Sequence, residues 1–241
     1  MGNRVGGCTL NYDRLVPLDP DLERDLRALL DYPAEGTATE IKDWLNLASR
    51  IERANVARAL IALANSGGGN LLFGFTETSG GWEPSGECTH DLARYSQDEI
   101  NNILKAHAEP VFECSTYHLD SGAGTRHVVV AVPGGHRVPI RSRRAPAGSR
   151  LADHCYYIRR PGPESAPPDS GAEWQQLIER CMENNRERQL EGFRRVLEVL
   201  RSEPGLAQEV ADLAAGESDP LLHWARESID RLDQLGGSGD G

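Results

Sequence analysis

The chain has 241 residues, of which 39% are hydrophobic, and its formal net charge is −11. This length allows one full hydrophobic core with an appendage. No apolar run approaches the roughly 20 residues that span a bilayer, and an acidic average argues against a general coat for nucleic acid. Because the first residues also lack the pattern of a signal peptide, we expect a soluble, cytoplasmic protein without membrane contact.

The five cysteines are widely spaced, and no two of them form a Cys-x-x-Cys pair. Neither Cys88 with His90 nor His154 with Cys155 has the spacing of a zinc knuckle. We therefore expect free thiols, without disulfides and without zinc.

The N-terminal part predicts a helix and then a strand. Residues 21–31 place leucines at helical spacing behind acidic residues, and Pro33 ends this helix. Residues 37–44 are β-branched and are expected to form a strand, on which Glu40 and Lys42 share one face. A carboxylate that holds a divalent cation beside a lysine that offsets phosphate charge is one way to build a phosphodiesterase. A solvated, salt-bridged strand face is the ordinary alternative.

The next segment runs from helix to strand through glycines. Residues 51–64 are rich in alanine and leucine and predict a buried helix, and residues 71–75 predict a buried strand. The loop Asn65–Gly69 between them could cradle a phosphate or cap the helix. We favour the cap, because a phosphate loop of the Walker type runs from strand to helix and carries a lysine.

The rest of the chain predicts a mixed sheet followed by helices. Residues 96–108 predict a helix with Ser96 as its N-cap. Strands are expected at 111–119, 126–133, 137–141 and 154–160, and helices at 171–184, 186–201, 206–214 and 219–234. The fold class is therefore α/β, a mixed sheet flanked by helices. We expect this unit at about 15–183, a helical extension at 185–235 and a disordered tail at 236–241.

Charge is unevenly distributed along the chain. The segment from His136 to Arg160 carries a net +6, whereas the segment from Arg201 onward carries a net −6. Clustered arginines favour binding of nucleic-acid phosphates, although pairing with the acidic tail is the alternative. The candidate arginines are Arg137, Arg141, Arg143, Arg144, Arg150, Arg159 and Arg160. Tyr156 and Tyr157 are candidates for stacking on bases, and one of them is expected in the core.

Five sequence elements in order carry a resemblance to a known family. They are Glu35, the step Glu40-Ile41-Lys42, the helix end Ala62–Gly69, the segment Gly74–Glu77 and the segment Tyr157–Gly162. With them, about residues 30–183 resemble the AlbA-type domain of the Schlafen family, in a bacterial form with a single lobe.

The resemblance implies a metal-dependent endoribonuclease that acts on structured RNA such as tRNA. It implies that Glu35, Glu40 and Glu77 hold Mg²⁺ or Mn²⁺ and that Lys42 meets the scissile phosphate. Glu77 stands where the family has an aspartate, so its carboxylate reaches about one methylene further. Because eukaryotic members pair two lobes, a homodimer would rebuild that shape, and a role in phage defence or stress fits a bacterial member.

Two other readings of the same resemblance stay open. Bacterial relatives include DNA- or RNA-binding regulators, in which the carboxylates would be structural. A nucleotide-binding module that takes ATP is the third reading.

Overall fold

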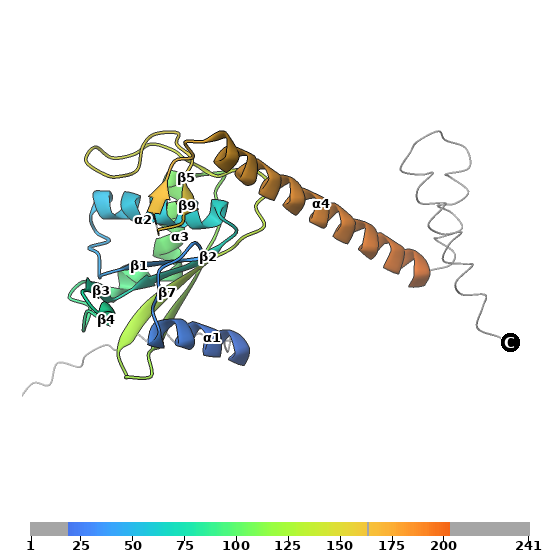
Figure 1. The fold of residues 1–241 in the computed structure, drawn as a ribbon. Helices are drawn as coiled ribbons and strands as arrows, with labels where there is room; N and C mark the ends of the chain where they lie inside the picture. Colours follow the sequence, from blue (N-terminus) through green and yellow to red (C-terminus); the bar gives the residue numbers. More distant parts are fainter. Residues whose placement is uncertain (1–18, 163, 203–241) are drawn as a thin grey trace, which may run out of the picture. The chain divides into compact units, whose positions relative to one another are not determined.

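The computed structural model describes residues 19–162 and 164–202. Its central sheet has four strands in the order β1-β2-β7-β6. β1 pairs in parallel with β2, whereas the two remaining pairings are antiparallel. The predicted mixed sheet is therefore confirmed (Figure 1), and its strands are β1 (Thr39–Lys42), β2 (Gly69–Phe73), β6 (Ser115–Asp120) and β7 (Arg126–Val132).

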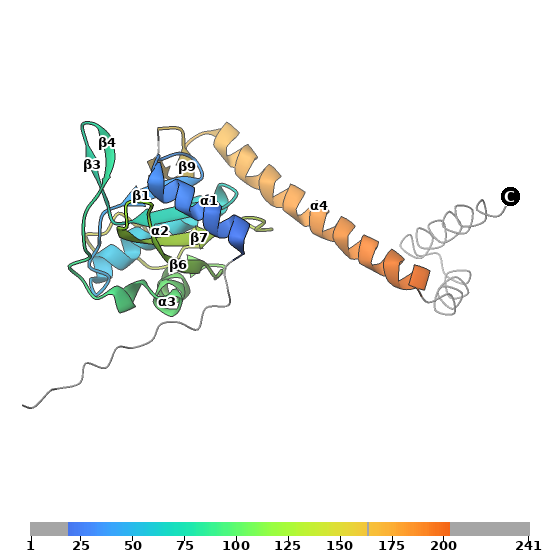
Figure 2. The same ribbon diagram turned by 90° about the horizontal axis from the view of Figure 1, so that it is seen from below.

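Helices cover both faces of this sheet. α2 (Arg50–Asn65) and α3 (Gln97–His107) lie on one face, and α1 (Pro20–Asp31) lies on the other (Figures 1 and 2). Side chains alternate along β2, so Leu71 packs into the core beneath α2 and Leu72 into the core beneath α1. The sheet thus separates two hydrophobic cores, one on each face.

The helix ends follow from the residues found there. Asp19 caps α1 by accepting from two backbone N–H groups, and Ser96 caps α3 by accepting from the Glu99 N–H, as predicted. α2 ends in three glycines with positive φ. A Cβ atom on Gly69 would lie 2.2 Å from the Ala38 carbonyl oxygen, so only glycine lets the chain pass β1 this closely. The Gly68 N–H donates to the Leu63 carbonyl at 2.9 Å, and this bond at the end of α2 confirms the helix-cap interpretation of the loop.

Short strand pairs surround the central sheet. Gly74, with φ of 96°, separates β2 from the next strand and divides the predicted strand 71–75. The pairs are β3 (Phe75–Thr78) with β4 (Gly81–Pro84), β5 (Ala108–Glu109) with β8 (Arg141–Ser142), and β9 (Ile158–Arg160) with β10 (Glu164–Ala166). A 3₁₀ turn, η1 (Leu92–Tyr95), precedes α3. β9 and β10 both pack against α2.

One helix replaces two predicted ones near the C-terminus. α4 (Gly171–Ser202) is continuous, so the expected break between 171–184 and 186–201 is wrong. The residues at that point include neither glycine nor proline, so none of them interrupts the backbone hydrogen bonds of the helix. The predicted helices 206–214 and 219–234 and the tail 236–241 lie outside the described residues.

The chain divides into two compact units, Met1–Ile178 and Glu179–Gly241. The division falls inside α4. Among the helices of residues 19–162 and 164–202, none combines the length and the apolar character needed to cross a bilayer. The four cysteines in the described part are free thiols, as the sequence predicts.

Candidate functional site

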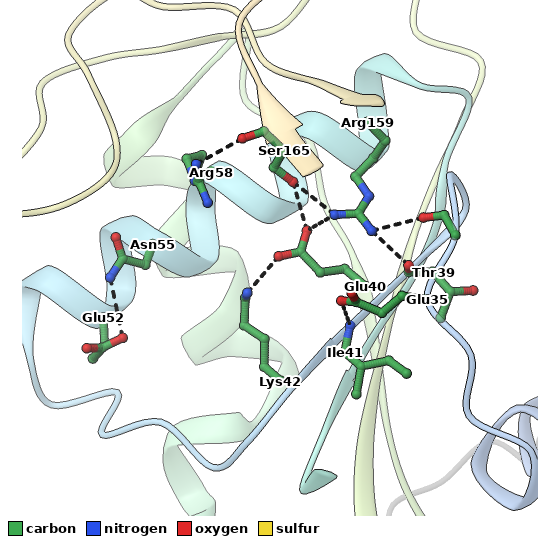
Figure 3. Close-up of polar contacts among 11 residues, drawn as sticks. Glu35, Thr39, Glu40, Ile41, Lys42, Glu52, Asn55, Arg58, Arg159 and Ser165 are labelled. Atoms are coloured by element: carbon green, nitrogen blue, oxygen red, sulfur yellow. Dashed lines mark hydrogen bonds and ion pairs between the residues drawn. The ribbon is translucent and has the colours of Figure 1, made fainter. Parts of the chain in front are cut away.

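Glu40 and Lys42 lie on the same face of β1, as the sequence predicts. Ile41 between them packs into the core beneath α1, so both charged side chains point toward α2. Glu40 Oε1 lies 2.6 Å from Lys42 Nζ. Its Oε2 accepts hydrogen bonds from Arg159 at 2.9 Å and from the Ser165 hydroxyl at 2.8 Å. Figure 3 shows these groups converging on one carboxylate, whose two oxygens are both engaged.

Arg159 is buried at the centre of this arrangement. Its side chain is 1% exposed, and its second terminal nitrogen donates to the carbonyls of Gly36 and Thr39 at 2.9 and 3.0 Å (Figure 3). The prediction that Arg159 contacts nucleic acid is therefore wrong, because a phosphate cannot reach a guanidinium that is enclosed by protein. Arg159 instead links β9 to β1 through its hydrogen bonds to Glu40 and Thr39.

Glu35 lies next to this ion pair and is anchored by the backbone. Its Oε1 accepts from the Ile41 N–H at 2.9 Å. Burial raises the pKa of Glu35, while Arg159 and Lys42 lower it in part and Glu40 raises it further. Burial alone would also raise the pKa of Glu40, but the charge and hydrogen bonding of Lys42, with Arg159 and Ser165, hold it below its usual value. The pKa of Glu35 is thus raised while the pKa of the neighbouring Glu40 is lowered.

Arg58 and Ser165 complete the site and were missed by sequence reasoning. Arg58 lies on α2 and donates to the Ser165 carbonyl at 2.9 Å. Asn55, three residues earlier on the same helix, binds Glu52 (Figure 3). The position of Arg58 among the buried Ala57, Ala59 and Leu60 of this helix was the available signal.

Glu77 does not join Glu35 and Glu40. It is an exposed residue of β3, paired across the hairpin with Trp82. In residues 19–162 and 164–202, no three His, Cys, Asp or Glu side chains are arranged to hold a metal ion. The oxygens of Glu40 are engaged by two cationic side chains and a hydroxyl, so this donor set, as arranged, does not fit Mg²⁺ or Mn²⁺.

The remaining candidate arginines differ in their ion pairs and exposure. Arg141 pairs with Glu109 at 2.8 Å, and Arg160 pairs with Glu173 at 2.7 Å. By contrast, three arginines are exposed and form no ion pair with any residue of the described chain; they are Arg143, Arg144 and Arg150. Arg137 is exposed on the segment that precedes β8.

The three unpaired arginines belong to one loop, residues 143–150, which is held against helices. The Arg143 N–H donates to the His107 carbonyl at the end of α3, at 2.7 Å. The Arg150 N–H donates to the Asn55 side chain on α2, at 2.9 Å. The loop therefore meets α2 one helical turn before Arg58, close to the Glu40 site.

The two tyrosines differ in their surroundings. Tyr157 is a core residue whose hydroxyl oxygen accepts from the Ala152 N–H at 2.7 Å. Tyr156 is half-buried and meets Trp174 edge to face, with ring centroids 5.4 Å apart. The expectation that one of the pair lies in the core is confirmed.

Comparisons with known proteins identify one matching family and two similar solved structures. The family model described as Schlafen, AlbA_2 matches residues 35–165, which include Glu35, Glu40, Arg159 and Ser165. The solved structure of DIP2311 from Corynebacterium diphtheriae is 14% identical with a TM-score of 0.42, covering 63% of this chain and 30% of its own. The N-terminal domain of a RecG-related protein from Nitrosomonas europaea is 21% identical with a TM-score of 0.37, covering 54% of this chain and 86% of its own. Among curated proteins, a search finds no significant match.

Proposed function

Because the chain belongs to the Schlafen AlbA_2 family, we propose that it binds nucleic acid, and RNA in particular, through the loop 143–150. The observation that carries the proposal is the presence of three exposed arginines that have no carboxylate partner within residues 19–162 and 164–202, Arg143, Arg144 and Arg150. Arg141 and Arg160 are neutralised within the domain. A guanidinium without a partner keeps its full charge and its fork of donors for a phosphate.

The position of the loop supports the same proposal. It is anchored to α2 and α3 by backbone hydrogen bonds of 2.9 and 2.7 Å, so its arginines extend from a fixed support. At the Glu40 site, Lys42 keeps about a quarter of its side chain exposed and, being paired with Glu40, offers a nucleic-acid backbone hydrogen-bond donors rather than net positive charge.

Titration of labelled RNA at several salt concentrations tests the proposal. Removing two phosphate contacts with the double variant Arg143→Ala/Arg144→Ala should lower affinity and reduce the slope of log affinity against log salt by roughly 1.4 to 1.8. The double variant Arg24→Ala/Arg195→Ala removes two exposed arginines elsewhere and serves as the matched control. Equal affinity and slope for wild type and the loop variant would overturn the proposal. Duplex DNA in parallel decides between RNA and DNA.

The second candidate function is cleavage of RNA in which the Glu35 carboxyl group takes part. It is favoured by a half-buried carboxyl group with a raised pKa beside Glu40 and Lys42, since such perturbed groups concentrate at reactive sites. Glu40 is engaged in its ion pairs, so a bound Mg²⁺ or Mn²⁺ would need an arrangement of these carboxylates other than the one described. When bound, such an ion would supply charge stabilisation at a phosphate.

Incubation of the protein with tRNA, in Mn²⁺ or in EDTA, tests cleavage. Glu35→Gln keeps an oxygen that accepts from the Ile41 N–H but removes the charge, and is expected to abolish any metal-dependent cutting. Glu77→Ala tests the third carboxylate at an exposed position where no fold contact is lost. Undiminished cutting by Glu35→Gln would eliminate this candidate.

The homodimer implied by two-lobed relatives is checked by light scattering of the same sample.

A further inference from the structure

A pocket of about 460 Å³ lies within the α/β unit, apart from the Glu40 ion pairs. Its walls include Trp44, Glu87, Cys88, Leu92, Thr125 and Arg126. The volume falls within the range of roughly 300–1,000 Å³ that is usual for pockets that hold small organic ligands. The residues come from the segment after β1, the segment after β4, the start of η1, and the turn before β7 with the first residue of that strand.

The indole of Trp44 forms a fixed wall of this pocket. Its N–H donates to the Gly86 carbonyl at 3.0 Å, and its ring meets Tyr95 edge to face at 5.4 Å. The ring also packs closely against Gly74, which follows β2. A Cβ atom at Gly74 would lie only 2.7 Å from an indole carbon. A large aromatic surface held by three contacts is ready to stack on a planar ligand without rearrangement.

The other walls provide polar groups at the edge of such a ligand. The Thr125 hydroxyl forms no hydrogen bond with another described residue, so it can donate or accept. The Arg126 guanidinium is held in place by two hydrogen bonds to Asp120. Leu92 adds an apolar surface, and Glu87 adds an exposed acceptor. A flat ring with donors and acceptors around its edge matches these walls.

We propose that this pocket binds a nucleobase, stacked on Trp44 with its polar edge toward Thr125. The inference rests on the proposed binding of nucleic acid. Trp44 follows Lys42 by two residues, a chain distance of roughly 7 Å, and it packs against the same core that lies beneath α2. A strand with a phosphate near Lys42 can therefore place an unpaired base in the pocket.

Affinity for a short labelled oligouridine tests this assignment. Trp44→Leu keeps an apolar side chain but removes the stacking surface, and should weaken binding by about 5- to 150-fold, the usual loss for one stacked base. Thr125→Trp leaves the backbone hydrogen bonds of the turn intact and fills the pocket, so it should weaken binding similarly. Trp82→Leu, a tryptophan that packs on the α1 side, is the matched control and should bind as wild type.

The outcomes separate the two proposals. If wild type binds the oligomer and needs Arg143 and Arg144, but both pocket variants bind as tightly as wild type, the pocket assignment is overturned and the proposed function stands. If no RNA or DNA binds at all, the proposed function fails. Uridine and adenosine monophosphates, titrated alone, distinguish the source of the base, since tight binding of a mononucleotide that Thr125→Trp abolishes supports the pocket with a free nucleotide as its ligand.

Discussion

Replacing Glu40 by glutamine should destabilise the domain strongly, because the carboxylate neutralises two cationic side chains inside it. Arg159 is 1% exposed and Lys42 is 24% exposed, and both lie within 2.9 Å of Glu40. Glutamine keeps the shape and an acceptor for Ser165 but removes the negative charge that directly contacts both cationic side chains. Loss of one partner of a buried pair costs about 3–5 kcal/mol. At about 2–4 °C for each kcal/mol, the melting temperature should fall by roughly 6–20 °C.

The stability lost in Glu40→Gln should be largest at neutral pH and should become smaller as the pH falls. The pKa of Glu40 is lowered in the folded protein, so the folded state holds the ionised carboxylate better than the unfolded chain does. The stabilisation is fully present above the ordinary glutamate pKa of the unfolded chain and is lost as the pH falls through the lower folded value. Because glutamine does not titrate, the difference in unfolding free energy between wild type and Glu40→Gln should shrink as the solution is acidified.

Urea unfolding followed by circular dichroism, repeated from neutral to acidic pH, measures this difference. Glu23→Gln removes an exposed carboxylate that pairs with Arg27 along α1 and should cost less than about 1 kcal/mol. A Glu40→Gln variant as stable as this control at neutral pH would refute the buried ion pair. If the difference in unfolding free energy between wild type and Glu40→Gln stays constant as the pH is lowered, the stabilisation does not depend on the charge of Glu40.

Three further outcomes are expected. Asn65→Ala removes hydrogen bonds to the Ile140 N–H and carbonyl and to the Tyr157 carbonyl, and should cost roughly 2–4 kcal/mol in urea unfolding; a loss below the control value would contradict it. Glu77→Ala, at an exposed position, should change stability by less than about 0.5 kcal/mol. Burial raises the pKa of the Cys114 thiol to about 12, so a thiol reagent should modify Cys114 only after unfolding, and fast labelling of Cys114 itself in the native protein, mapped by mass spectrometry of its peptide, would disprove this.

The strongly periodic segments were predictable from the sequence. The helix at 96–108 and the strand at 126–133 match α3 and β7 within a few residues. The shared face of Glu40 and Lys42 also follows from the alternation of side chains on a strand. Local patterns of this kind are decided by neighbours in the sequence, so they survive in the folded chain.

The partners of Glu40 were not predictable in the same way, because Arg159 lies 119 positions along the chain. One local signal was nevertheless available. Consecutive residues of a strand point to opposite faces, so Arg159 and Arg160 on β9 could not both face solvent. Glu77 was misplaced for a different reason. Gly74 interrupts the backbone with φ of 96° and starts a separate hairpin, so proximity in sequence to β2 does not bring Glu77 to the site.

The contacts of Glu35 and Arg159 with β1 also affect whether a strand of another chain can pair with the edge of the sheet. β1 is an outer strand, and the groups on its free side include the Ile41 N–H and the Thr39 carbonyl. Glu35 accepts from the first and Arg159 donates to the second. An outer strand with unpaired backbone groups recruits strands from other chains, either as a binding mode or as aggregation. By occupying these groups, two side chains compete with any strand that would add to this edge of β1.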